Sequence, residues 1–150
     1  MRTRDLYLRY WPYVREGLFL ALDQLADEQL AFTPREGLWS LGQIACHIAE
    51  AEEGWFRHIV TGELTSWPEY RLEDYASVSA VKGLLDQVHG RTITYLESLD
   101  EAGLDQVIEA SWGGKFSLRW VFWHVLEHEV HHRGEIFLLL GLLGMDAPDV

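Results

Sequence analysis

The stretch that decides the fold is residues 117–143, which read SLRWVFWHVLEHEVHHRGEIFLLLGLL. It contains no proline, and its apolar residues recur at the three- and four-residue spacing of an amphipathic helix. The pattern starts at Ser117. Gly144 is typical of the position just after a helix. The pattern predicts one long helix from Ser117 to about Leu143.

Three further helical patterns precede this stretch, and breaks rich in Pro and Gly separate them. We expect helices over 3–26, from Ser40 to about residue 61, and from Ser77 or Ser79 to about residue 99. Ser40 and Gln43 have the spacing of a capping box, in which each side chain pairs with the other residue's backbone N–H. Residues 107–115 could form a short hairpin. Four such helices predict an all-α four-helix bundle in one domain over 1–150. Two of the connections are long, so the pattern alone does not assure simple up-down-up-down wiring.

Composition narrows the classes of function. The 150 residues carry 24 Asp and Glu against 12 Lys and Arg, a net charge of -12. A nucleic-acid or anionic-membrane partner is therefore disfavoured by charge repulsion. The longest apolar run, 136–145, is too short to cross a bilayer. The only cysteine, Cys46, cannot form an internal disulfide, and residues 1–8 do not resemble a signal peptide, so we expect a cytoplasmic protein.

Histidines mark the centre of the chemistry. Four of the seven lie between His124 and His132. On a helical wheel, His132 falls near the middle of the core-facing side and His128 on its flank, one turn away. Two inward imidazoles one turn apart can chelate one divalent metal. His124 and His131 fall at the edge of the same face, and their roles stay open.

A third ligand is expected from a facing helix, and His47 is the best candidate. It lies on the flank of the apolar stripe of the second helix, whereas His58 is too far along that helix and His89 is expected at the surface. Three histidines leave at least one open position, which is typical of a catalytic metal. The donor set suits Zn, Ni, Fe or Co about equally. We expect Zn or Ni, with Fe, Co and Mn as alternatives. The alternative is that these are boundary histidines hydrogen-bonded to the backbone.

Three carboxylates could act beside the metal, although no catalytic residue can be assigned. Glu52 lies within the apolar stripe of the second helix, and a buried carboxylate needs a partner. Pairing with Arg133 is the leading interpretation, and orienting a histidine or acting as general base are the alternatives. Glu129 and Glu135 could each orient an imidazole. Cys46 is interpreted as a small buried residue rather than as a nucleophile.

Four segments carry a resemblance to a known family: LWSLGQ at 38–43, HIAEAE at 47–52, SLRW at 117–120 and HEVHHRGE at 128–135. Their order over about residues 5–145 resembles the DinB/YfiT-like superfamily of bacterial four-helix-bundle proteins. The resemblance implies a bundle with long crossovers, often homodimeric, and a metal triad that falls on His47, His128 and His132. Members include thiol-dependent S-transferases, a maleylpyruvate isomerase, proteins labelled metal hydrolases, and proteins without known activity.

Two functional hypotheses follow. The first is a metal-dependent enzyme that activates a low-molecular-weight thiol or water, as an S-transferase or a hydrolase of a small-molecule substrate. The second is a non-catalytic, metal-binding stress or scaffold protein. A DNA-binding damage factor is disfavoured by the charge.

The end of the last predicted helix, 137–143, is apolar nearly all round, and one bundle core covers only a stripe of a helix. We therefore expect a homodimer in which Phe137 or Leu138 contacts the partner, unless the first helix covers them.

Overall fold

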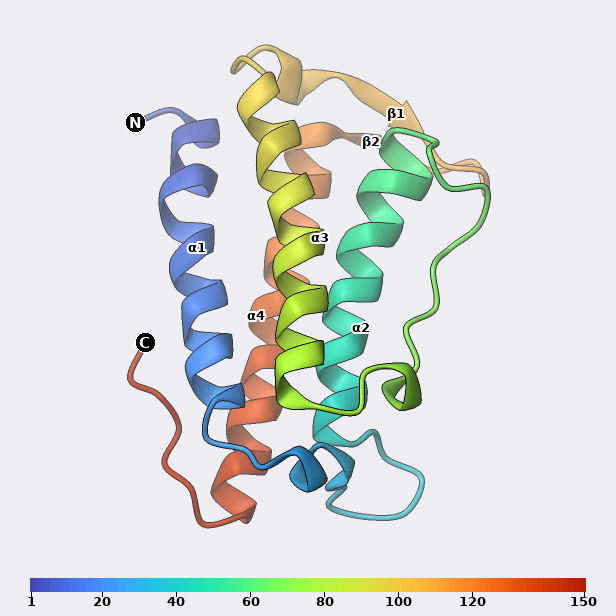
Figure 1. Cartoon of the computed structure of the whole chain (residues 1–150). Coiled ribbons are helices and arrows are strands. Elements are labelled where there is room, and N and C mark those ends of the chain that lie inside the picture. The colour runs from blue at the N-terminus through green and yellow to red at the C-terminus, as the bar shows by residue number, and fades with distance from the viewer.

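The computed structural model describes residues 1–150 and consists of four long helices and one short hairpin (Figure 1). The long helices are α1 (Thr3–Leu22), α2 (Leu41–Glu53), α3 (Val78–Ser98) and α4 (Leu118–Leu142). Short 3-10 turns are η1 (Asp27–Ala31), η3 (Leu72–Asp74) and η4 (Gly103–Asp105). The strands β1 (Val107–Glu109) and β2 (Lys115–Ser117) pair antiparallel, with Ile108 opposite Phe116. The all-α four-helix bundle predicted from the sequence is thereby confirmed.

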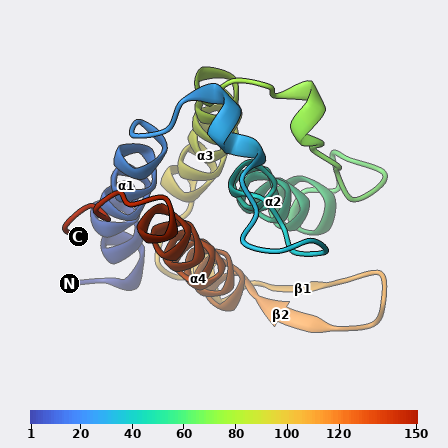
Figure 2. The same ribbon diagram turned by 90° about the horizontal axis from the view of Figure 1, so that it is seen from below.

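The helices pack in a square in which α1 and α2 each touch both α3 and α4. In Figure 1, α1 and α4 run downward, whereas α2 and α3 run upward. Because α2 and α3 are parallel neighbours, the connection between them must return along the whole bundle, and the green segment does so. Seen along the bundle in Figure 2, the hairpin projects beyond the end of α4 on the side of α2. The predicted long crossover is therefore present.

The helices α2, α3 and α4 begin at the serine residues expected from the sequence. Ser40 Oγ accepts a hydrogen bond from the Gln43 backbone N–H at 3.2 Å, and Gln43 Oε1 accepts one from the Ser40 N–H at 2.8 Å. Ser77 at α3 and Ser117 at α4 each accept one hydrogen bond through the hydroxyl, from the backbone N–H of Ala80 and of Trp120, without the reciprocal bond. Each cap satisfies an N–H that has no partner within its helix. The first predicted helix is too long, since α1 ends at Leu22 and η1 occupies part of the expected loop.

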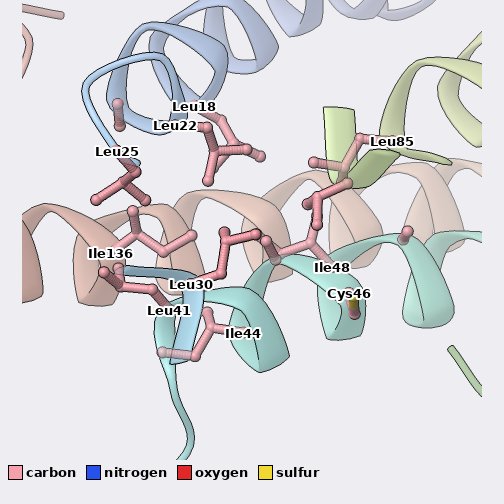
Figure 3. Packing of buried hydrophobic residues seen from close by; sticks show 14 of the residues in the cluster. Leu18, Leu22, Leu25, Leu30, Leu41, Ile44, Cys46, Ile48, Leu85 and Ile136 are labelled. Atoms are coloured by element: carbon pink, nitrogen blue, oxygen red, sulfur yellow. The ribbon is translucent and has the colours of Figure 1, made fainter. Parts of the chain in front are cut away.

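The core has two apolar parts, one at each end of the bundle. Figure 3 shows part of the first, where α1, α2, α3 and α4 meet. The second is built around Trp11 and Phe122. Between the two parts, all four helices contribute buried polar or charged residues: Arg15, Glu52, His89 and Glu129. None of the helices combines the length and apolar character that a membrane span needs.

A π-helical segment, η2 (Gly54–Val60), continues α2 directly. Its first residue has no room for a side chain, because a Cβ on Gly54 would lie 2.4–2.7 Å from the indole of Trp67. We expect Gly54→Ala to lower the free energy of unfolding by about 1–3 kcal/mol through overpacking. A Cβ on Gly83 or on Gly90 in α3 meets nothing within 4 Å. Alanine there should be neutral or stabilising in the same urea titration, and equal losses at Gly54 and Gly83 would contradict the packing argument.

Candidate metal centre

Three histidines from two antiparallel helices converge on one point. His47 comes from α2, and His128 and His132 come from successive turns of α4. The Nε2 atoms of His47 and His128 lie 3.1 Å apart. The ring centroids are 4.9 Å apart for His47 and His128, 4.9 Å for His47 and His132, and 4.4 Å for His128 and His132. One ring nitrogen of each lies within 4.8 Å of the others, so the three predicted ligands form a cluster that could hold one metal ion.

The protonation state of these rings suits a metal. Burial, followed by the charges of neighbouring imidazoles, lowers the pKa of His128 to about 3. Burial and His132 also lower the pKa of His47. Neutral imidazoles offer the lone pairs that a metal needs, whereas protonated ones do not. With two Nε2 atoms at 3.1 Å and a third ring beside them, the donor set fits a divalent cation.

Glu135 contacts the triad, as the sequence suggested for one of the carboxylates. Its Oε2 lies 2.6 Å from Nδ1 of His132. A carboxylate in this position accepts a hydrogen bond from Nδ1–H and so leaves the Nε2 lone pair free for a metal. Glu50 is more distant, with Oε1 4.0 Å from Nδ1 of His47.

The other two carboxylates do not reach the triad. Arg15 Nη2 donates to Glu52 Oε2 at 2.8 Å, and Arg15 Nε donates to Glu129 Oε1 at 2.7 Å. The expected pairing of Glu52 with Arg133 is therefore wrong. Arg133 instead donates to the backbone carbonyl of Val14 at 3.3 Å. As a result, Glu52 and Glu129 belong to a buried ionic layer, and neither orients a histidine of the triad.

The expectation that His89 lies at the surface is also wrong. The residue is buried, and its Nδ1 lies 2.9 Å from Glu52 Oε1. The reason is helical spacing, because Leu85, Thr92 and Leu96 lie on the same face of α3 and are all buried.

The remaining histidines and the cysteine lie outside the triad. His124 stacks on Trp120 with centroids 4.7 Å apart and planes 9° apart. His131 is exposed, and its Nε2 lies 3.4 Å from Glu135 Oε1. His58 Nδ1 lies 2.9 Å from the Leu64 carbonyl oxygen. Cys46 is buried in the core, and burial raises the pKa of its thiol to about 11, which disfavours a nucleophilic role.

Trp39 borders the triad, and the sequence reasoning did not single it out as a site residue. Its ring centroid lies 4.6 Å from that of His47 and 6.1 Å from that of His132, and half of the residue is exposed. Trp39 separates two hollows, one of about 340 Å³ that includes His47 and one of about 370 Å³ that includes Leu138. The largest hollow, about 710 Å³, lies between η2 and α3 and includes none of the three histidines. The space beside the triad is therefore the pair of hollows next to Trp39.

The metal-free protein is expected to lose stability as the pH falls below about 6.5, the usual pKa of histidine. The pKa of His128 is about 3 in the folded chain, so between these values the unfolded chain binds more protons. The free energy of unfolding then decreases as the pH decreases. Thermal unfolding at pH 7.5 and pH 5 measures the loss. The loss of stability between the two pH values should be smaller in His128→Gln and unchanged in the exposed control His131→Gln. An unchanged loss in His128→Gln would contradict the assignment of the lowered pKa to His128.

Comparison with known proteins identifies the family. Residues 13–136 match the family model of the DinB superfamily. A protein of Oceanobacillus iheyensis named "Putative metal-dependent hydrolase" is 26% identical over 129 residues, which cover 79% of this chain and 75% of that protein. A DinB-like protein from Bacillus cereus superposes with a TM-score of 0.76 at 25% identity, over 96% of this chain and 95% of that chain.

YfiT from Bacillus subtilis, described as a probable metal-dependent hydrolase with an unusual four-helix bundle topology, superposes with a TM-score of 0.75 at 20% identity. The superposition covers 95% of this chain and 89% of YfiT, and at this identity it shows the fold alone. The family model, in contrast, spans most of the chain, including all three histidines of the triad. The chain belongs to the DinB superfamily.

Proposed function

We propose that this chain is a metal-dependent enzyme that holds one divalent metal through His47, His128 and His132 and activates water for hydrolysis of a small molecule. Zn or Ni is the metal we favour, and Fe, Co or Mn would also suit the ligands. One observation carries the proposal: three imidazole nitrogens from two helices lie within 4.8 Å of one another. The relative from Oceanobacillus iheyensis, which is named as a metal-dependent hydrolase, supports water as the nucleophile.

A divalent metal held there would supply a Lewis acid that lowers the pKa of a nucleophile such as water or a thiol. The protein's own residues arrange the donors. Glu135 Oε2 holds the proton on Nδ1 of His132, which turns Nε2 toward the other two rings. His47 and His128 are only partly buried, so a small molecule can approach the triad from solvent. Trp39 forms an apolar wall at that approach.

Activity assays on the metal-loaded protein test the proposal. We expect hydrolysis of an activated ester such as 4-nitrophenyl acetate that chelation and His128→Ala both abolish. A matched control is the exposed His131→Ala, which should keep the rate. If protein that carries one metal per chain shows no hydrolysis, the proposed hydrolase activity is contradicted.

A low-molecular-weight thiol is the alternative nucleophile, and cobalt-substituted protein distinguishes it. Addition of bacillithiol, mycothiol or glutathione should produce a thiolate-to-cobalt absorption band if the metal has an open position. Conjugation of such a thiol to an electrophile would then assign an S-transferase. Full metal binding with neither the band nor hydrolysis would instead support the non-catalytic metal-binding protein.

We also propose a homodimer formed through the last turns of α4. Phe137 is partly buried and lies under the Arg133 guanidinium, 5.4 Å from its carbon. Leu138 and Leu142 are 67% and 60% exposed, so they are the apolar contacts left for a partner. We expect light scattering to give about twice the chain mass of 17.3 kDa, and Leu138→Glu to halve that value. A wild-type mass equal to one chain at micromolar concentration would refute the dimer.

We also propose that the chain is cytoplasmic. Cys46 is a single buried thiol without a disulfide partner, which suits a reducing cytoplasm. Because the net charge of -12 repels other anions, we propose neither a nucleic acid nor a membrane as a partner.

A further inference from the structure

Aromatic rings follow one another at every fourth residue from Phe116 to His132. Centroids are 4.6 Å apart for Phe116 and Trp120, 4.7 Å for Trp120 and His124, 6.4 Å for His124 and His128, and 4.4 Å for His128 and His132. Residues four apart lie on one face of a helix. The first three rings, Phe116, Trp120 and His124, are called the aromatic ladder here, and they continue directly into the triad.

Trp55 packs against all three rings of the ladder. It is buried and stands edge-on to all three rings, with centroids 5.5 Å from Phe116, 5.6 Å from Trp120 and 5.2 Å from His124. Trp112 of the hairpin loop stands edge-on to Trp55 in turn, at 6.0 Å. Edge-to-face contacts of this kind favour one ring arrangement over others. The ladder is therefore a preorganised surface rather than a loose group of side chains.

The ladder and the neighbouring Trp112 are open to solvent and have unused donors. Trp120 is 39% exposed and Trp112 is 58% exposed. Of the seven indole N–H groups in the chain, only that of Trp11 donates to a protein acceptor, Glu129 Oε2 at 2.7 Å. Large exposed aromatic surface beside a candidate metal centre is typical of ligand recognition, because burying it against a ligand is favourable.

Few charged side chains pair with the ladder. The one charged group that pairs with the ladder is Glu127, 3.9 Å from Nδ1 of His124, and no Lys or Arg pairs with it. A ligand that packs here would have to lose its own hydration, which is costly for a charged group and cheap for an apolar one. The chemistry of the surface thus suits an uncharged ring.

We propose that the aromatic ladder binds a flat, uncharged aryl group of the substrate, whose reacting group then lies at the triad. This inference rests on the proposed function. Ring edges and indole N–H groups carry partial positive charge, so they complement the π-face of an aryl group and its oxygen substituents. Eight residues separate Trp120 from His128, or about 12 Å along the helix. A substrate with its aryl group about 10 Å from the bond that reacts would span both.

A second copy of the chain is the competing occupant. The dimer surface proposed above begins at Leu138, 18 residues after Trp120, or about 27 Å further along α4. A dimer through Leu138 and Leu142 does not need the ladder. The ladder is thus free for a small molecule in either oligomeric state.

Binding of 2-naphthol, compared with its saturated counterpart decahydro-2-naphthol, tests the inference without any activity measurement. We expect calorimetry on the metal-loaded protein to give a Kd about tenfold lower for the aryl compound, and Trp120→Leu to raise that Kd about tenfold. Trp112→Leu, on the hairpin loop, should weaken binding as well. Trp123→Leu is the matched control, because Trp123 is an exposed indole of α4, 55% exposed against 39% for Trp120, and makes none of the ring contacts of the ladder. It should leave the Kd unchanged, and indole N–H resonances of Trp55, Trp112 and Trp120 should shift in the wild type.

Other outcomes overturn the inference. Equal affinity for the two compounds, or equal effects of Trp120→Leu and Trp123→Leu, would show that the ladder does not select an aryl group. A shift from dimer to monomer in Trp120→Leu with unchanged naphthol binding would make the ladder an interface between copies. If naphthol binds as expected in a protein without hydrolase or transferase activity, the proposed function fails and the aryl site stands. If metal binds and esters are hydrolysed but naphthol does not bind, the proposed function stands and the aryl site is contradicted.

Discussion

Replacing Arg15 with methionine is expected to lower the free energy of unfolding by about 3–5 kcal/mol, because it leaves two buried carboxylates without their cation. Arg15 Nε and Nη2 donate to Glu129 at 2.7 and 3.0 Å, and Nη2 also donates to Glu52 at 2.8 Å. Its Nη1 donates to the Leu85 carbonyl oxygen at 2.7 Å. One guanidinium thus ties α1 to each of the other three helices.

The protonation of Glu52 shows how strongly this layer is coupled. Burial raises the pKa of Glu52, but the charge of Arg15 and the hydrogen bond from His89 outweigh burial and bring the pKa to about 2. Without Arg15, the hydrogen bond from His89 would be left to oppose burial, which disfavours the charged form. The pKa of Glu52 should then rise, and part of the lost stability should return at acid pH.

Arg133→Met is the matched control for Arg15→Met. Arg133 makes one hydrogen bond, to the Val14 carbonyl at 3.3 Å, and it pairs with no carboxylate. Its loss should cost about 1 kcal/mol. The triple variant Arg15→Met, Glu52→Gln, Glu129→Gln removes all three charges and should recover part of the loss. Urea titrations of these variants measure the differences, and equal losses for the two arginine variants would contradict the account.

Replacing His128 with alanine is expected to abolish stoichiometric metal binding. His128 contributes the nitrogen closest to His47, at 3.1 Å, and its loss leaves two imidazoles on different helices. Two ligands rarely make a tight site, so metal affinity should fall by at least about 100-fold. Elemental analysis after dialysis measures the content.

His124→Ala is the matched control, because His124 lies about one turn from His128 and belongs to no group of residues that could hold a metal. It should retain about one metal per chain. Full metal content in His128→Ala, or loss of metal in His124→Ala alone, would show that the ligands are other residues.

The sequence predicts the four helices and the three histidines because both depend on local spacing. Ser40 caps α2 as expected, α3 and α4 begin at the expected Ser77 and Ser117, and the wheel places His128 and His132 on one inward face. His47 meets the other two histidines because α2 packs against α4, and a four-helix bundle brings such helices together.

The buried ionic layer could not be read in the same way, because partners from different helices are chosen by packing. Glu52 was recognised as buried, yet its partner Arg15 lies 37 residues away on α1. A signal existed, since Arg15 falls at helical spacing between the buried residues Trp11 and Leu18. The same signal was available for His89, between Leu85 and Leu96. A charged side chain aligned with an apolar stripe indicates a buried partner rather than a surface position.

The π-helical turn at Gly54 was not predicted either. The indole of Trp67, in the crossover, occupies the space that a side chain at Gly54 would fill. A turn of this kind is frequent near functional sites, and here it contains Trp55, which supports the aromatic ladder.

A crystal structure of the metal-loaded protein, with anomalous data at the absorption edge of the bound metal, tests the central claim most directly. The account predicts one anomalous peak per chain, bonded to ring nitrogens of His47, His128 and His132, with at least one coordination position left for a non-protein ligand. A peak at other residues, or a site closed by four protein ligands, would contradict it.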